Sequence, residues 1–181
     1  MRVTHMKPAV PYAGIPLLCT ILFMLQWSNA GAFTLLQRGL LVVFGYLAAV
    51  SDIRTKKVPN GLILAMSAGW VLSLVPQLFF DTEAALAILR NSVLGFVISG
   101  ALFLLVYYVS KRGLGGGDVK FMAAAGLYLG FQGILPAMLI GSVLAGLFGI
   151  ALMLLGKIGR RDSIQLVPFL YIGILATIFF Q

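Results

Sequence analysis

Two aspartates are the residues in this chain whose type and position are best suited to chemistry. Asp118 ends the glycine-rich stretch Gly113-Leu-Gly-Gly-Gly-Asp, and an apolar segment follows it. Asp52 closes an earlier apolar segment and precedes a short basic run. The chain has only five acidic residues. An acidic residue at the end of a membrane-length apolar segment is costly, which makes both aspartates candidate functional residues.

If the two carboxylates meet, they can hydrolyse an amide by acid–base catalysis. Two carboxyl groups within a few ångströms of each other do not both ionise easily, so they share one proton. The ionised group can deprotonate a water while the protonated group donates to a peptide carbonyl. No other residue set offers an equally complete mechanism, because the only histidine, His5, lies in the terminal segment and no catalytic triad can be assembled.

Each aspartate taken alone also has a structural explanation. Asp118 opens an apolar helix after three glycines, where aspartate is a favoured N-cap. Asp52 stands at a helix end beside basic residues, where an interfacial acid is ordinary. The glycine-rich stretch lacks the Gly-Lys-Ser/Thr of a phosphate-binding loop and the Gly-x-Gly-x-x-Gly of a dinucleotide site. Its glycines can instead let another backbone come close, as a peptide substrate requires.

The composition predicts an integral membrane protein. Of the 181 residues, 61% are hydrophobic and 10% are charged, whereas a soluble domain carries about 25% charged residues. The net charge of +8 comes from short basic clusters between apolar segments, a pattern of cytoplasmic loops rather than of a nucleic-acid-binding protein. With one cysteine, Cys19, and one histidine, we expect no disulfide, no metal and no cofactor.

Apolar segments predict the elements that must position the aspartates. A membrane-spanning helix needs about 20 apolar residues. We therefore expect an all-α membrane protein, a polytopic bundle of seven transmembrane helices. The seven predicted segments are residues 10–27, 35–51, 62–80, 87–110, 119–131, 134–156 and 164–180.

The basic residues predict an orientation. With seven helices, 11 of the 13 lysines and arginines fall on one side, and only Arg38 and Arg90 lie near the other face. The positive-inside rule makes the basic side cytoplasmic. We therefore expect a multi-pass plasma-membrane protein with a cytoplasmic N-terminus. Asp52 and Asp118 come out on the same cytoplasmic side, which supports pairing them.

The first apolar segment has an alternative interpretation. Its basic start, its apolar run and the following Ser28-Asn-Ala30 resemble a cleavable secretory signal. Cleavage there would leave the topology of the other six helices unchanged. Small residues at helix-packing spacing predict close helix contacts. These pairs are Gly45 with Ala49, Gly126 with Gly130, and Ser142 with Gly146.

Three motifs, taken together, resemble a known family. Gly115-Gly-Gly-Asp118 fits the Gly-x-Gly-Asp motif of intramembrane aspartyl proteases, and the sequence through Gly130 closely resembles the type IV prepilin peptidases. The stretch Ser51-Asp-Ile-Arg-Thr-Lys-Lys-Val-Pro-Asn60 is similar to the segment that carries that family's first aspartate. Val167-Pro-Phe-Leu-Tyr-Ile-Gly173 is similar to its last core helix. The resemblance covers about residues 35–180.

The resemblance implies a bundle of six core transmembrane helices plus one additional N-terminal helix, with residues 1–34 as the N-terminal segment and residues 35–181 as the six-helix membrane domain. It also implies a catalytic pair, Asp52 and Asp118. It implies a prepilin or pseudopilin substrate whose basic leader is cut at the cytoplasmic face just before its apolar helix. Larger members also methylate the new N-terminus and carry an N-terminal cytoplasmic region, often with paired cysteines. This chain shows no such region or pair. We therefore expect the short, peptidase-only form, without methyltransferase activity.

Five further residues are expected to support the site. Gly115 and Gly117 would shape the turn that places Asp118 and let substrate backbone approach. Lys120, two positions further along a helix, would face away from Asp118 and contact lipid headgroups, with a direct catalytic role as the alternative. Pro59 and Asn60 would begin the next helix.

Two other functions stay open at this point. One is a small proton- or cation-coupled transporter or channel component that uses the same aspartates. The other is a catalytically inactive scaffold. A conduction pathway would need polar residues at mid-membrane depth, where the predicted helices are almost entirely apolar.

Overall fold

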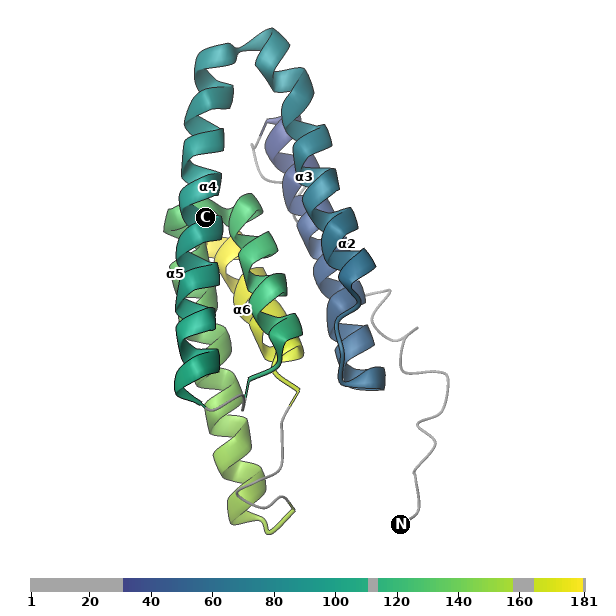
Figure 1. Cartoon of the computed structure of the whole chain (residues 1–181), viewed down its shortest axis with the longest axis vertical. Coiled ribbons are helices and arrows are strands. Elements are labelled where there is room, and N and C mark those ends of the chain that lie inside the picture. Colours follow the sequence, from purple (N-terminus) through teal and green to yellow (C-terminus); the bar gives the residue numbers. More distant parts are fainter. Residues whose placement is uncertain (1–30, 111–113, 158–164, 181) are drawn as a thin grey trace.

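The computed structural model describes residues 31–110, 114–157 and 165–180, which form an all-α structure (Figure 1). Four of the described helices are long and apolar enough to cross a membrane, and a fifth, α6, has 14 residues. The predicted N-terminal helix and its signal-peptide alternative lie outside the described residues. The described helices are α2 (Ala32–Thr55), α3 (Asn60–Phe80), α4 (Thr82–Val109), α5 (Gly116–Leu154) and α6 (Val167–Phe180).

The expected count of six core helices is not reproduced, because the predicted segments 119–131 and 134–156 join in α5. The backbone breaks inside α5 at Gly130, where φ is 62° and ψ is −174°, a conformation that favours glycine. The Phe131 N–H next to the break donates to Asn91 Oδ1 of α4 at 3.1 Å. The chain reverses direction here, so both ends of α5 lie toward the lower end of Figure 1.

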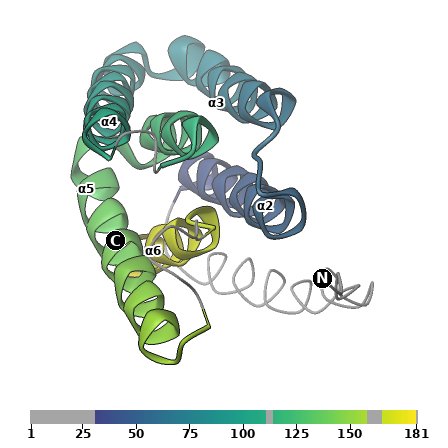
Figure 2. The ribbon, with the colours of Figure 1, turned by 60° about the horizontal axis from the view of Figure 1, so that its bottom comes forward.

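The first half of α5 is the central helix of the bundle. In Figure 2 it is surrounded by α2, α3 and α4. Every residue from 121 to 126 is buried, so this helix has no lipid-facing side over these two turns. The stretch Ala123-Ala-Ala-Gly126 keeps its surface small, and small residues allow helices to approach closely in lipid.

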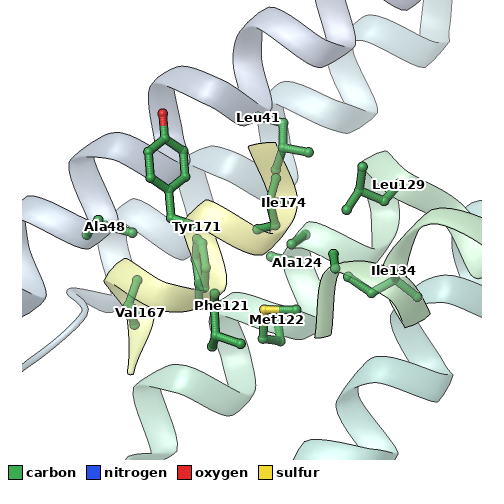
Figure 3. Packing of buried hydrophobic residues seen from close by; sticks show 14 of the residues in the cluster. Leu41, Ala48, Phe121, Met122, Ala124, Leu129, Ile134, Val167, Tyr171 and Ile174 are labelled. Carbon is green, nitrogen blue, oxygen red and sulfur yellow. The ribbon is translucent and has the colours of Figure 1, made fainter. Parts of the chain in front are cut away.

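α6 packs against both α2 and α5 and completes the main core (Figure 3). Tyr171 of α6 is 5% exposed, and its hydroxyl donates to the Val42 carbonyl of α2 at 3.1 Å. Ile174 and Val167 are fully buried in the same cluster. The anchoring of α6 on α2 matters for the site because α6 begins where α2 ends.

Two of the three predicted small-residue contacts are confirmed. A Cβ on Gly126 would lie 2.5 Å from the Gly95 carbonyl oxygen of α4, and one on Gly45 would lie 2.7 Å from the Tyr171 ring. Larger side chains at these positions would separate the helices. The contact expected at Gly146 is wrong, since a Cβ there would meet no described atom within 4 Å.

Candidate active site

Asp52 lies in the last turn of α2, against the beginning of α6. Its side chain is 5% exposed, and the backbone N–H of Val167 donates a hydrogen bond to its carboxylate. The next available amides of α6, those of Phe169 and Leu170, bond to the Leu166 carbonyl at 3.1 Å. The amide of Val167 is thus directed to Asp52, at a helix end whose dipole favours an anion.

One oxygen of Asp52 stays unpaired. Within the described part of the chain, Asp52 Oδ2 and Trp70 Nε1 are the buried side-chain polar atoms that have no hydrogen-bond partner. Leaving a buried acceptor unpaired costs roughly 1–3 kcal/mol, and more if it is charged. Asp52 Oδ2 is therefore an acceptor that a reacting water or peptide could use.

Asp118 lies in the first turn of α5, but it is not the N-cap. Gly115 is the N-cap residue, and Asp118 is the third residue of the helix. The Gly115 N–H donates to Asp118 Oδ2 at 3.1 Å, and the half-buried side chain is held in place by this bond. Asp118 therefore does cap the start of α5, as the sequence suggested, but from the third helical position instead of the N-cap. The bond from Gly115 occupies only one of its two carboxylate oxygens.

The structure places Asp52 and Asp118 at the same end of the bundle, within electrostatic range of each other. The two carboxylates lie close enough for the charge on Asp52 to act on Asp118. They come from helices that run beside one another at the end of the bundle where α2 ends and α5 begins (Figure 1). The described residues hold no group of three or more His, Cys, Asp or Glu side chains that could bind a metal.

An ordered loop between α2 and α3 lies beside this pair. The hydroxyls of Ser51 and Thr55 both donate to the Lys57 carbonyl, at 3.0 and 3.1 Å. Lys56 adopts a left-handed conformation, with φ of 54°, and Val58 is only 8% exposed. These contacts fix the conformation of the loop that follows Asp52 and leads to α3.

The three glycines before Asp118 differ in their surroundings. A Cβ on Gly117 would lie 3.4 Å from both Cβ and N of Val58, and one on Gly115 would lie 3.1 Å from Asp118 Oδ2. A Cβ on Gly116 would meet nothing within 4 Å. Gly115 has φ of −75° and ψ of 137°, which any residue can adopt. Neither glycine is needed for its backbone conformation; a Cβ would be tight at position 115 and in ordinary van der Waals contact with Val58 at position 117.

Lys120, Asn60 and Pro59 meet at the edge of the site. The Lys120 ammonium donates to Asn60 Oδ1 at 3.0 Å, and both side chains are exposed. Pro59 is the N-cap residue of α3 and Asn60 its first residue, as expected for a helix start. The hydrogen bond between Lys120 and Asn60 was not expected from the sequence, and it joins the first turns of α5 and α3.

Gln165 is a neighbour of the site that sequence reasoning missed. Its Nε2 donates to the Ile53 carbonyl at 3.2 Å, one residue beyond Asp52. The available signal was a polar residue directly before the last apolar segment, and that signal is weak because loops commonly carry glutamine.

Comparisons with known proteins identify the family. Residues 39–150 match the model of the type IV leader peptidase family. The chain is 29% identical over 174 residues to a prepilin leader peptidase/N-methyltransferase of Xanthomonas campestris, covering 90% of this chain and 56% of that protein. It is 28% identical over 162 residues to the Escherichia coli protein of the same name, covering 86% and 67%.

A third relative, from Burkholderia pseudomallei, bears the same name and is 30% identical over 151 residues, which cover 77% of this chain and 46% of that protein. The chain thus spans about half the length of the first curated relatives it matches. No solved structure gave a significant match. The matched region holds both aspartates and most of the described helices, and the chain therefore belongs to the type IV leader peptidase family.

Proposed function

We propose that this chain is an intramembrane aspartic endopeptidase that removes the basic leader of prepilin-like proteins. The observation that carries the proposal is that the carboxylates of Asp52 and Asp118, from separate helices, lie within electrostatic range of each other, with Oδ2 of Asp52 buried and unpaired. Membership of the leader peptidase family supports the substrate class. The names of the curated relatives give two activities, prepilin leader peptidase and N-methyltransferase, and we propose the first for this chain.

The proposed mechanism uses the two carboxylates and one water. One carboxylate is ionised and takes a proton from the water, while the other is protonated and donates to the scissile carbonyl. The N–H groups of Val167 and Gly115 hold one oxygen of Asp52 and Oδ2 of Asp118, respectively. The remaining oxygens are then available to water and substrate. Each carboxylate is thus oriented by a backbone donor, so little reorganisation is needed during the reaction.

We further propose that cleavage takes place at the cytoplasmic face. Exposed basic residues cluster at the end of the bundle that holds the aspartates. They are Arg54, Lys56, Lys57, Lys120 and Lys157. The positive-inside rule supports a cytoplasmic position for this end. A substrate leader in the cytoplasm, joined to an apolar helix in the bilayer, would present its cleavage site at this depth.

The two halves of α5 are proposed to cross the bilayer separately. The reversal at Gly130 supports this arrangement, because a backbone turn inside a membrane is tolerated where protein contacts satisfy its polar groups. Asn91 provides such a contact at Phe131. With α2, α3, α4 and α6, this gives six core crossings, as the family resemblance implies.

The test is a cleavage assay in membranes. The protein is co-expressed with a prepilin-like substrate from the same genome, and the new N-terminus is read by mass spectrometry. Cleavage by the wild type, and not by Asp52→Asn or Asp118→Asn, is the expected result. The same spectra report methylation of the new N-terminus, which we propose is absent. The transport alternative gains no support from the family match.

A further inference from the structure

Gln165 connects the beginning of α6 to the last turn of α2. Its side chain is half-buried, and its amide donates to the Ile53 carbonyl at 3.2 Å. Two residues further on, the Val167 N–H bonds to the Asp52 carboxylate. The segment 165–167 therefore contacts adjacent residues of α2 twice, once through a side chain and once through the backbone.

The Ile53 carbonyl needs a partner from outside its own helix. The last four carbonyls of an α-helix have no intrahelical donor. The Asp52 carbonyl accepts from the Lys56 N–H at 2.8 Å, but Lys57 is already outside the helix, so the usual donor to Ile53 is lost. Gln165 supplies it instead. This bond caps α2 from the segment that precedes α6, at the turn that carries Asp52.

We propose that Gln165 is a positioning residue for Asp52, which keeps the last turn of α2 against the first amide of α6. The inference rests on the proposed peptidase function. Without the bond from Gln165, the last turn of α2 can fray, and the carboxylate moves relative to Val167 and Asp118. Gln165 touches neither carboxylate through any described contact, so it acts through backbone geometry alone.

The expected effect is moderate. Losing the net contribution of a single hydrogen bond should lower kcat by roughly 2- to 13-fold if the bond acts on positioning. KM should stay within about twofold, since the proposed role concerns the position of Asp52 and not the binding of substrate. Gln165→Met keeps the length of the side chain and removes the donor. Gln165→Lys keeps a donor on a side chain that is one atom longer and positively charged.

The experiment combines turnover with hydrogen–deuterium exchange on the full chain in detergent micelles. A peptide covering residues 52–58 reports the Lys56 amide, which closes the last turn of α2. Gln165→Met should exchange faster there and lose turnover, while Gln165→Lys should stay nearer to wild type in both. Gln77→Met is the control, because Gln77 is half-buried in α3 and its side chain bonds to no described residue.

The outcomes separate this inference from the proposed function. If the wild type does not cleave a prepilin-like substrate, the proposed function fails, but the exchange measurement still tests the cap. If the wild type cleaves and Gln165→Met matches it in kcat and in exchange, the positioning role is wrong. It is also wrong if Gln165→Lys is as impaired as Gln165→Met, because restoring a donor would then have no effect.

Discussion

α2 carries a buried polar side chain near each end, and the two sites differ in how they are satisfied. Gln37 is 8% exposed, and its amide donates to Ser73 Oγ at 3.3 Å. The Ser73 hydroxyl donates in turn to the Trp70 carbonyl at 2.7 Å. At the other end, Asp52 is equally buried but holds an ionisable group with an unpaired oxygen.

This difference distinguishes polar groups that hold helices together from a polar group that is available for a reaction. Neutral amide and hydroxyl groups that bond across helices stabilise a membrane bundle by about 0.6–2 kcal/mol each. An acid whose oxygen has no partner contributes no such stabilisation, and it persists only where function requires it. Trp70 Nε1 is also unpaired, but it is a neutral donor and less costly than a carboxylate. The Gln37 cluster is therefore structural, and the Asp52 end is the candidate reactive centre.

The largest effect is expected from removing either carboxylate. Asp52→Asn and Asp118→Asn should each lower cleavage by at least about 100-fold, since general acid–base catalysis typically contributes 10²–10⁴-fold. Both variants should accumulate in the membrane at wild-type levels. Quantitative immunoblotting of substrate and mature product measures both quantities. Near-normal turnover in either variant would show that the pair is not catalytic.

A smaller loss is expected from Gly117→Val. The added methyl groups would press on Val58, which already lies 3.4 Å from the position of a Cβ. Displacing catalytic groups by about 1 Å can cost on the order of 100-fold, so we expect a loss of at least about 10-fold. Gly116→Val is the matched control, because nothing lies within 4 Å of its Cβ. Equal losses at both positions would argue against a specific contact at Gly117.

Ser73→Ala should break the structural site without breaking the reactive one. It removes the acceptor of the Gln37 amide and leaves that amide unpaired, at a cost of about 1–2 kcal/mol. Thermal unfolding in detergent should begin at a lower temperature, while turnover per folded molecule stays within about twofold of wild type. Loss of turnover at an unchanged melting temperature would contradict the view that the Gln37 end of α2 is structural and only the Asp52 end is reactive.

The smallest effect is expected at the exposed bond between Lys120 and Asn60. Exposed polar pairs contribute about 0.2–1 kcal/mol, so Lys120→Met and Asn60→Ala should each lower turnover by roughly two- to threefold. The double variant should be no worse than the single ones, because both remove the same bond. Lys157→Met controls for loss of an exposed charge. A loss at Lys120 comparable to that of Asp118→Asn would instead indicate a direct role in catalysis.

The sequence by itself determined that this is a membrane protein, and it singled out two aspartates as candidate functional residues. Hydropathy is a local property, so the apolar runs predicted α3 closely, over residues 62–80 against the observed Asn60–Phe80. Because acidic residues are scarce in so apolar a chain, Asp52 and Asp118 stood out from residue type and position alone. The three motifs in order predicted the family, which the comparisons confirm.

The hydropathy pattern already predicted an interruption between residues 131 and 134, and the tertiary structure decided its form and what holds Asp52. At the break beside Gly130 the Phe131 N–H donates to Asn91 of α4, and no local pattern identifies that partner. The bonds from Gln165 and Val167 to the end of α2 join residues more than a hundred positions apart. Such contacts follow from how helices pack in space, which hydropathy and residue spacing along the chain do not encode.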